Sequence, residues 1–351
     1  MKPQIKTILA IESSCDETAC AIIRDGREML ANIIASQADL HAQFGGVVPE
    51  VAARSHIEVV IPVIEEALEE AKLTWDDIDA IAVTRGPGLI GSLLIGTLTA
   101  QVIAREKQKP LIGVNHILAH AYASFLTDKQ QPDFPMLALV VSGGDTRLML
   151  FQEDLSFETL GATRDDAAGE AFDKVAKLLG LPYPGGPNIS RVAESGDDSA
   201  YSFPIAKLGP ESLEFSFSGL KTAVLRQVQE IIGDQPGLSD LRKTYQLPPQ
   251  AVSDIAASFE KTVVETLVRG LVRAYDRYSP ASVVIGGGVS ASKRLRKEIL
   301  KAIPETHIVE PVFCTDNAAM IGALAYRMAQ AGIGVNAEAE TIEADSSLDV
   351  L

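Results

Sequence analysis

Ile8-Leu-Ala-Ile-Glu-Ser-Ser-Cys-Asp-Glu-Thr18 and Leu137-Ala-Leu-Val-Val-Ser-Gly-Gly-Asp-Thr146 are the two stretches that decide the fold. Each is an apolar run followed by a small polar turn, an acid and a threonine, which predicts a buried strand, a turn and a return strand. Later in each half a strand, a glycine-rich turn and a helix follow, at Ala82–Leu94 and at Val284–Leu295. The matching order predicts duplicated α/β units around a central cleft, where backbone N–H groups of both turns would grip phosphates.

The composition is that of a folded globular protein with room for two domains. The 351 residues are 46% hydrophobic and 22% charged, which excludes a disordered chain. The three cysteines form no C-x-x-C pair, so we expect a reducing, cytoplasmic compartment. The uncharged stretch 86–104 is long enough to cross a bilayer, but its glycines and Pro87 favour a buried helix entered through a turn. We therefore expect no membrane partner.

The charge balance limits how the chain can bind nucleic acid. Its 31 basic and 47 acidic residues give a net charge of -16, which excludes non-specific binding through the whole surface. A nucleic-acid partner would need a local basic patch or a helper protein. One cluster on a predicted helix is either such a patch or an ordinary solvated helix face. It consists of Lys293, Arg294, Arg296, Lys297 and Lys301.

His116 and His120 are four residues apart, directly after a short apolar run. On a helix, residues at this spacing share one face, so both imidazoles can bind one metal ion. The alternative is a pair of surface or capping histidines, because a histidine pair needs a third ligand to indicate a metal site.

Other segments give expectations about the elements and the domains. Pro49 opens a predicted helix to about Lys72, in which Pro62 predicts a kink or break. Residues 1–130 and 316–335 are expected to form a first lobe, and residues 131–315 a second. Residues 336–351 are acidic and are expected to form a disordered, frayed tail.

A series of long motifs runs through the chain in order. They are Ile11-Glu-Ser-Ser-Cys-Asp-Glu-Thr18, Gly45-Gly-Val-Val-Pro-Glu50 with Arg54 and His56, Arg85-Gly-Pro-Gly-Leu-Ile-Gly-Ser92, Val114-Asn-His-x3-His120, Val141-Ser-Gly-Gly144, Asp165-Asp-Ala-Ala-Gly-Glu-Ala-Phe-Asp-Lys174, Tyr183-Pro-Gly-Gly-Pro187, Phe215-Ser-Phe-Ser-Gly-Leu-Lys-Thr222, Gly286-Gly-Gly-Val-Ser290 and Cys314-Thr-Asp-Asn-Ala-Ala-Met-Ile321. From about Ile8 to Arg327 the chain closely resembles the bacterial TsaD family, the transferases that form N(6)-threonylcarbamoyladenosine in tRNA.

The resemblance implies a two-lobed α/β fold like that of actin, hexokinase and the sugar kinases. It also implies a third metal ligand, Asp316, beside His116 and His120. One divalent ion per subunit would bind there, iron(II) first and zinc as the second choice. The family transfers a threonylcarbamoyl group from threonylcarbamoyl-adenylate to the exocyclic amine of the adenosine just after the anticodon, in tRNAs that read A-starting codons.

Further site residues follow from the same resemblance. Backbone N–H groups along the strand end and turn would hold the phosphate or carboxylate, and three more positions match the family's adenylate-holding residues. Asp16 and Glu17 are expected to help deprotonate the attacking amine or to hold the tRNA side; a pair that stabilises the turn is the alternative. The substrate-binding set is Val140, Val141, Ser142, Gly143, Gly144, Asp173, Gly186 and Ser292.

Two positions depart from the family pattern. Asp145 stands where the bacterial family usually has histidine, and Ser292 where it usually has asparagine. An acid repels an anionic ligand, and a hydroxyl makes fewer hydrogen bonds than an amide. We therefore expect both changes to weaken or re-tune adenylate binding. If the double substitution Asp145→His and Ser292→Asn leaves the affinity for the adenylate unchanged, this expectation is wrong.

Partners and rival functions complete the expectations. The family works on tRNA with a TsaB-like paralogous partner and a TsaE-like P-loop ATPase, and we expect both here. A metallopeptidase is one alternative, although Ile117 follows His116, so the H-E-x-x-H motif with its general base is absent. A small-molecule kinase on the same fold and a non-catalytic scaffold are the others. The intact set of His116, His120 and Asp316 argues against a scaffold.

Overall fold

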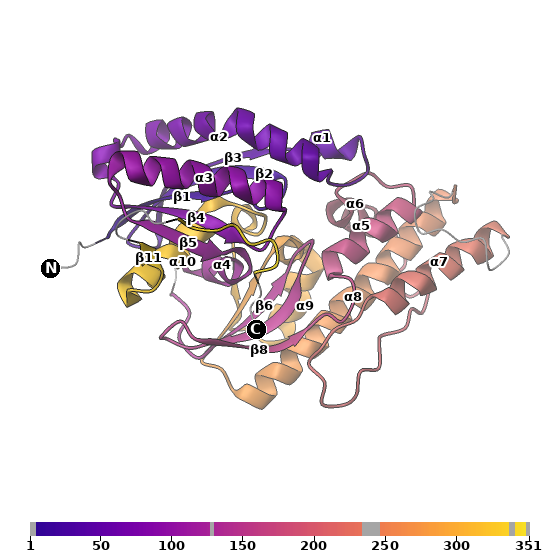
Figure 1. The fold of residues 1–351 in the computed structure, drawn as a ribbon. Helices are drawn as coiled ribbons and strands as arrows, with labels where there is room; N and C mark the ends of the chain where they lie inside the picture. The colour runs from indigo at the N-terminus through magenta and orange to yellow at the C-terminus, as the bar shows by residue number, and fades with distance from the viewer. Residues whose placement is uncertain (1–4, 127–129, 234–245, 337–340, 349–351) are drawn as a thin grey trace. The chain divides into compact units, whose positions relative to one another are not determined.

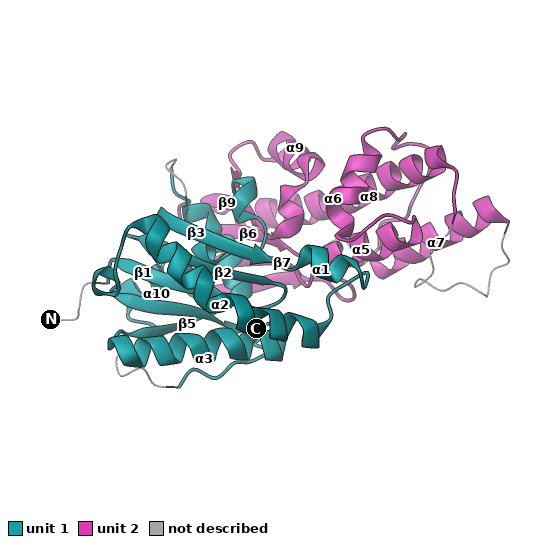
Figure 2. Ribbon diagram, turned by 90° about the horizontal axis from the view of Figure 1, so that it is seen from above, with its two compact units in different colours: residues 1–132, 152–156, 309–351 teal, residues 133–151, 157–308 magenta. Residues whose placement is uncertain are grey.

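The structure is a computed structural model that describes residues 5–126, 130–233, 246–336 and 341–348. It divides into two compact units (Figure 2). Unit 1 comprises Met1–Pro132, Gln152–Ser156 and Val309–Leu351, and unit 2 comprises Asp133–Phe151 and Phe157–Ile308. Three stretches that were expected in the second lobe therefore belong to unit 1, namely residues 131–132, 152–156 and 309–315.

Unit 1 is built on a mixed sheet with the strand order β11-β5-β4-β1-β2-β3. Strand β1 pairs antiparallel with β2 and parallel with β4, so it lies inside the sheet. Every residue of β1 is buried, as a strand covered on both faces requires. The strands are β1 Thr7–Glu12, β2 Glu17–Arg24, β3 Glu28–Ser36, β4 Ala80–Gly86, β5 Leu111–Asn115 and β11 Val335–Asn336.

Helices cover both faces of this sheet (Figure 1). Helices α2 and α3 lie side by side on one face, and α4 and α10 pack together on the other. The helices are α1 Ala38–Ala42, α2 Pro49–Ala71, α3 Ile90–Lys107, α4 His116–Tyr122 and α10 Ala318–Ala331, with short 3-10 turns at Trp75–Asp77, Ala123–Phe125 and Pro311–Phe313. Helices α4 and α10 therefore lie next to each other on the same face of the sheet.

Two expectations about unit 1 helices need correction. Helix α2 continues through Pro62 rather than breaking there. Pro62 and Glu58, whose carbonyl loses its helical donor, both face solvent, so water can bond that carbonyl. Helix α3 is not a buried helix, because Leu94 and Leu98 are 42% and 54% exposed.

The acidic tail also differs from expectation over the residues that the structure describes. Ile342 is buried, and its carbonyl accepts a hydrogen bond from Gln101 Nε2 (2.9 Å). The backbone N–H of Asp345 donates to the carbonyl of Arg85 (2.8 Å), and a Cβ on Gly86 would meet Asp345 O at 1.9 Å. Residues 341–348 are therefore docked by one apolar anchor and backbone bonds. Residues 337–340 and 349–351 of the predicted tail lie outside the described residues.

Unit 2 repeats the strand arrangement of unit 1. Its sheet has the order β10-β9-β6-β7-β8, in which β6, β7 and β8 form an antiparallel meander and β9 and β10 run parallel to β6. The strands are β6 Met136–Val141, β7 Thr146–Phe151, β8 Phe157–Ala162, β9 Ser282–Gly286 and β10 His307–Ile308. Positions 5-4-1-2-3 of unit 1 and 10-9-6-7-8 of unit 2 correspond, so the duplicated α/β unit is confirmed.

The helices of unit 2 pack on this sheet around a large apolar core. They are α5 Ala168–Leu178, α6 Gly185–Ala193, α7 Ser218–Ile232, α8 Pro249–Tyr278 and α9 Lys293–Ala302, with a 3-10 turn η3 at Gly288–Ala291. Among the described residues, no helix is long and apolar enough to cross a membrane.

Candidate metal centre

His116 and His120 lie on one face of α4, which begins at His116. Asn115 caps this helix: its Oδ1 accepts hydrogen bonds from the backbone N–H of Ile117 (2.9 Å) and of Leu118 (3.1 Å). The cap fixes where the first turn starts and hence the direction of His116. The two imidazole centroids are 4.7 Å apart at an interplanar angle of 78°. The predicted spacing therefore brings both rings together.

Asp316 stands ahead of α10, at a second helix start capped by an asparagine. Asn317 Oδ1 accepts the N–H of Met320 (3.1 Å) and so fixes this turn. Asp316 Oδ1 lies 3.5 Å from His116 Nε2 and 3.4 Å from His120 Nε2. The contact between α4 and α10 thus joins residues that are far apart in the sequence, all within unit 1.

The geometry and burial of these side chains fit a metal ion. Each offers one ligand atom, and these atoms lie within 4.8 Å of one another. Imidazole nitrogens and carboxylate oxygens bind zinc at about 2.0–2.2 Å, so two ligands of a tetrahedral ion are about 3.4 Å apart. His120 is 1% exposed, and among the described residues neither of its ring nitrogens has a hydrogen-bond partner. A metal ion between His120 and the Asp316 oxygen 3.4 Å away would satisfy this buried imidazole.

Glu12, the last residue of β1, supports the site from behind and was not among the predicted site residues. It is fully buried, and its Oε2 lies 3.0 Å from His116 Nδ1. Ser14 N–H donates to Oε1 (2.5 Å) and Thr84 Oγ1 to Oε2 (2.6 Å), which fixes the carboxylate. With its Nδ1–H donated to Glu12, His116 presents a free Nε2 toward Asp316. The available signal was an acid ending an otherwise apolar strand.

The charges at this site favour a cation between the two carboxylates. Burial acts to raise the pKa of Asp316, but His116 holds it well below its usual value. Burial acts to lower the pKa of His116, but Asp316 and Glu12 hold it well above its usual value. Burial likewise acts to raise the pKa of Glu12, and His116 keeps it below its usual value. A proton and a metal ion therefore compete for His116.

Asp16 and Glu17 lie where the β1–β2 turn enters β2. Asp16 is 8% exposed, and Glu17 Oε1 accepts a hydrogen bond from Ser36 Oγ (3.2 Å). Burial, together with the charges of Asp316 and Asp16, raises the pKa of Glu17 to about 9. Glu17 is thus within electrostatic range of the candidate metal centre, while its bond to Ser36 also ties β2 to β3.

The turn after β6 carries the predicted phosphate-binding residues. Ser142 N–H donates to Asp145 O (2.8 Å), which closes the turn. Gly143 and Gly144 stand exposed at its tip, with no atom within 4 Å of where a Cβ would lie. Val140 and Val141 are buried within β6 and position the turn. The open tip leaves room for a ligand.

The other predicted substrate-binding residues lie on elements packed against this turn, all in unit 2. Gly169 starts α5 against the turn, because its N–H donates to Ser142 O (3.2 Å). One helical turn further on, Asp173 Oδ1 accepts the N–H of Gly185 (2.7 Å), beside Gly186. Ser292 caps α9 by accepting the N–H of Leu295 (3.3 Å).

The two departures from the family pattern have local partners. Asp145 is bonded through both carboxylate oxygens to Arg147 Nε, at 2.9 and 2.8 Å. Its negative charge is therefore offset by a neighbouring strand residue. Ser292 Oγ donates to Glu260 Oε1 (3.4 Å) as well as capping α9.

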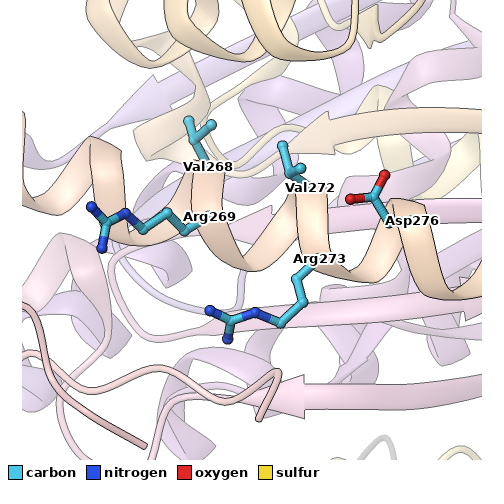
Figure 3. Close-up of a pocket in the computed structure, with 5 residues that line it drawn as sticks. All are labelled: Val268, Arg269, Val272, Arg273 and Asp276. Atoms are coloured by element: carbon cyan, nitrogen blue, oxygen red, sulfur yellow. The ribbon is translucent and has the colours of Figure 1, made fainter. Parts of the chain in front are cut away.

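The predicted basic cluster on α9 is partly engaged within unit 2. Arg294 is paired with Asp198, and Arg296 Nε donates to Ser290 O (2.7 Å). These contacts hold both guanidinium groups against other segments of unit 2. A separate open hollow of about 360 Å³ lies along α8 and contains none of the predicted site residues (Figure 3). It is lined by Val268, Arg269, Val272, Arg273 and Asp276.

Comparison with solved structures places the fold. The chain resembles HypF from T. kodakarensis with a TM-score of 0.62 and 14% identity, covering 96% of this chain and 50% of that one. It resembles component A of the Acidaminococcus fermentans (R)-2-hydroxyglutaryl-CoA dehydratase with a TM-score of 0.51 and 17% identity, covering 93% and 99%. The α/β fold of the actin, hexokinase and sugar-kinase class is confirmed.

Comparison with known sequences is far closer. The family model described as "TsaD: tRNA N6-adenosine threonylcarbamoyltransferase" matches residues 28–323. A relative of that name from Bacillus cereus (strain ATCC 10987 / NRS 248) is 48% identical over 339 residues, covering 94% of each chain. Another from Staphylococcus carnosus (strain TM300) is 45% identical over 348 residues, covering 98% of this chain and 96% of its own. The chain belongs to the TsaD family of tRNA N6-adenosine threonylcarbamoyltransferases.

Proposed function

We propose that this protein transfers the threonylcarbamoyl group of threonylcarbamoyl-adenylate to the exocyclic amine of the adenosine 3′ of the anticodon, in tRNAs that read A-starting codons. The observation that carries the proposal is the set of His116, His120 and Asp316, with Glu12 behind it, in a chain of this family. The names of the Bacillus and Staphylococcus relatives support the same reaction.

The metal proposed for this site is one iron(II) ion per subunit, with zinc as the second choice. Two imidazoles and one carboxylate are the donor set of non-haem iron(II) sites, and they leave coordination positions open for a substrate. When bound, the ion would supply Lewis acidity toward a carbamoyl oxygen. Glu12 holds the proton on His116 Nδ1, and the Asn115 cap orients the ring.

The adenylate is proposed to bind residues of unit 2. Within the predicted set, the backbone N–H groups of Gly143 and Gly144 at the open tip suit its phosphate or carboxylate, because the N–H of Ser142 is already bonded to Asp145 O. Asp173, Gly186 and Ser292 lie at starts or turns of the packed helices and suit the nucleoside. The pairing of Asp145 with Arg147 reduces the repulsion that an acid beside this turn would otherwise cause.

Asp16 and Glu17 are proposed to handle the proton of the attacking amine. With its pKa raised to about 9, Glu17 is mostly protonated at neutral pH. It must therefore lose its proton, or Asp16 must act, before the amine is deprotonated. The two carboxyl groups lie side by side in the chain at one turn, which suits a shared proton.

The proposed partners are tRNA, a TsaB-like paralogous protein and a TsaE-like P-loop ATPase, all in the cytoplasm. For the paralogous protein we propose the apolar face of α2 and α3. The two helices pack side by side, and exposed apolar residues recur on them at intervals of four. These residues are Ile57 and Ile61 on α2, and Ile90, Leu94, Leu98 and Val102 on α3.

The peptidase alternative is weaker because Ile117 follows His116, so the chain lacks the glutamate that activates water in an H-E-x-x-H peptidase. Glu12 is fully buried and already bonded to His116, Ser14 and Thr84. A peptidase of this donor type needs a free carboxylate beside the ion. The kinase alternative shares only the fold, which does not determine the reaction.

The test is incubation with threonylcarbamoyl-adenylate, unmodified tRNA and both partner proteins, followed by mass spectrometry of the nucleosides. We expect threonylcarbamoyladenosine in tRNAs that read A-starting codons and none in a tRNA lacking adenosine 3′ of the anticodon. Its absence from every tRNA would contradict the proposal.

A further inference from the structure

Glu260 is a buried carboxylate in the middle of α8. It is 5% exposed, and no ion pair involves it among the described residues. Its Oε1 instead accepts hydrogen bonds from two hydroxyl groups, Ser190 Oγ at 2.5 Å and Ser292 Oγ at 3.4 Å. Burying a carboxylate without a cation is costly and is retained only where strong donors offset the cost. The position therefore calls for an explanation beyond packing.

The two hydroxyl groups come from two different helical segments. Ser190 lies on α6, four residues after Gly186, so the two share a helix face. Ser292 is the N-cap of α9. Gly186 and Ser292 both belong to the proposed adenylate site. Glu260 thus ties together two segments that would contact one ligand, while Asp173 fixes the start of α6 from the other side.

A neighbouring hydroxyl group is left without a partner. Ser290, two residues before Ser292 in η3, is 1% exposed. Its Oγ is buried and has no hydrogen-bond partner among the described residues. Buried hydroxyl groups in folded proteins are nearly always bonded, so one that is not marks a place where a ligand group would bind.

The direction of the hydrogen bonds decides what the serines can offer. Since Ser190 and Ser292 give their protons to Glu260, only oxygen lone pairs remain for a ligand. They can therefore accept from ribose hydroxyls or from an adenine amine, and cannot donate. Without Glu260, the hydroxyl group of each serine would rotate freely and would no longer be held as a hydrogen-bond acceptor.

We propose that Glu260 is a positioning residue of the adenylate site, which orients Ser190 and Ser292 as hydrogen-bond acceptors for the nucleoside. The proposal rests on the proposed function, because it needs an adenylate at Gly186 and Ser292. Glu260 itself need not touch the ligand.

Isothermal titration with AMP tests the proposal directly, since AMP carries the nucleoside and leaves the acyl group out. We expect Glu260→Ala to raise the Kd for AMP about tenfold, because two oriented acceptors are lost. Glu260→Gln keeps an acceptor oxygen and should stay within about threefold of the unchanged protein. In the transfer assay Glu260→Ala should raise KM for the adenylate and leave kcat within about threefold.

A control variant, Ser258→Ala, and a double-mutant cycle between Glu260 and Ser190 distinguish the proposed role from a merely structural one. Ser258→Ala removes a buried hydroxyl of the same helix that bonds Tyr201 and Asp197 instead, and it should leave the Kd for AMP unchanged. In a Ser190→Ala background, Glu260→Ala should cost less than it does alone, because only Ser292 is then left for Glu260 to orient.

An unchanged Kd in Glu260→Ala, or fully additive effects with Ser190→Ala, would overturn the proposal. If the unchanged protein bound no AMP, the adenylate site of the proposed function would fall, and this inference with it. The two failures are distinguishable. Failure of the proposed adenylate site is seen in the protein without any substitution, whereas failure of the role of Glu260 is seen only in the variants.

Discussion

Glu12 lies behind the candidate metal centre, where it is placed to influence the site without binding the metal. Its carboxylate lies 3.0 Å from His116 Nδ1 and is held by Ser14 and Thr84. A carboxylate behind a histidine ligand fixes the tautomer and raises the basicity of the nitrogen that binds the metal. The three candidate ligands therefore depend on a fourth side chain.

Glu12→Gln should lower the affinity for iron(II) or zinc about 10- to 100-fold, because a neutral amide raises the basicity of His116 Nε2 less than a carboxylate does. Titration of the metal-free protein with each ion, followed by calorimetry, measures the change. Ser36→Ala, which removes a hydroxyl bonded to Glu17, serves as a control and should bind as before. Equal affinity in Glu12→Gln would show that Glu12 has no role in metal binding.

Glu17 gives a pH-dependent prediction for stability. Its pKa is raised from 4.5 to about 9, chiefly by burial, so the folded state keeps a proton that the unfolded state has released. Stability from this group is present below about pH 4.5 and is lost as the pH rises toward 9. Glu17→Gln should therefore stabilise the chelator-treated protein at pH 8, and the gain should vanish near pH 4. Urea unfolding at both pH values checks this, and a gain that is independent of pH would contradict the assigned protonation.

The sequence predicted part of the site because of local spacing. Two histidines four residues apart on a helix must share a face, so His116 and His120 follow from periodicity. Asp316 comes only from the family resemblance, since the contact between α4 and α10 is tertiary. Glu12 was missed because nothing in the sequence shows which side chain a strand end will face.

At the scale of elements, α2 and the tail show what propensity cannot decide. Pro62 predicts a kink or break, but α2 continues through it, because water can donate a hydrogen bond to the freed, solvent-facing carbonyl of Glu58. The acidic residues of the tail predict fraying, but the side chain of Ile342 packs over Gly113. The tail backbone at Asp345 and Ser346 also forms hydrogen bonds with the Arg85–Gly88 loop. Both outcomes depend on neighbours distant in the sequence.

Ile342→Ala should destabilise unit 1 by about 2–5 kcal/mol, because the tail loses its buried anchor. Thermal unfolding measures the change. Ile333→Ala, at a position 44% exposed, is the matched control and should shift Tm little. Equal Tm values for the two variants would mean that the tail is not docked.

The exposed face of α2 and α3 gives a prediction about assembly. Leu98→Glu places a charge on this face, at a residue 54% exposed, and should weaken binding of the TsaB-like partner at least about tenfold without lowering Tm. Size-exclusion chromatography and calorimetry with the purified partner measure it. Ile232→Glu on α7, at a residue 38% exposed, adds the same charge elsewhere and should bind normally. If both variants bind the partner equally well, the interface lies elsewhere.

At the scale of the whole molecule, the repeated strand order was predictable, whereas the different chemistry of the two corresponding turns was not. The stretches 8–18 and 137–146 both predict a strand, a turn and a return strand, and each sheet contains this unit at the corresponding position. The two turns have nevertheless diverged. In unit 1 the turn supports candidate metal ligands through Glu12 and Ser14, whereas in unit 2 its open glycine tip suits an anion. Duplication fixes a common backbone, and the side chains decide the chemistry.

The central claim is that the metal held by His116, His120 and Asp316 serves threonylcarbamoyl transfer. Its most direct test is to titrate iron(II) into metal-free protein and measure bound metal and threonylcarbamoyladenosine formed in the same samples, with both partners present. We expect the rate to rise in proportion to bound metal and to saturate at one ion per chain. His120→Ala should bind about 100-fold more weakly and stay inactive at that metal concentration. Full transfer by metal-free protein, or by His120→Ala without bound metal, would contradict the claim.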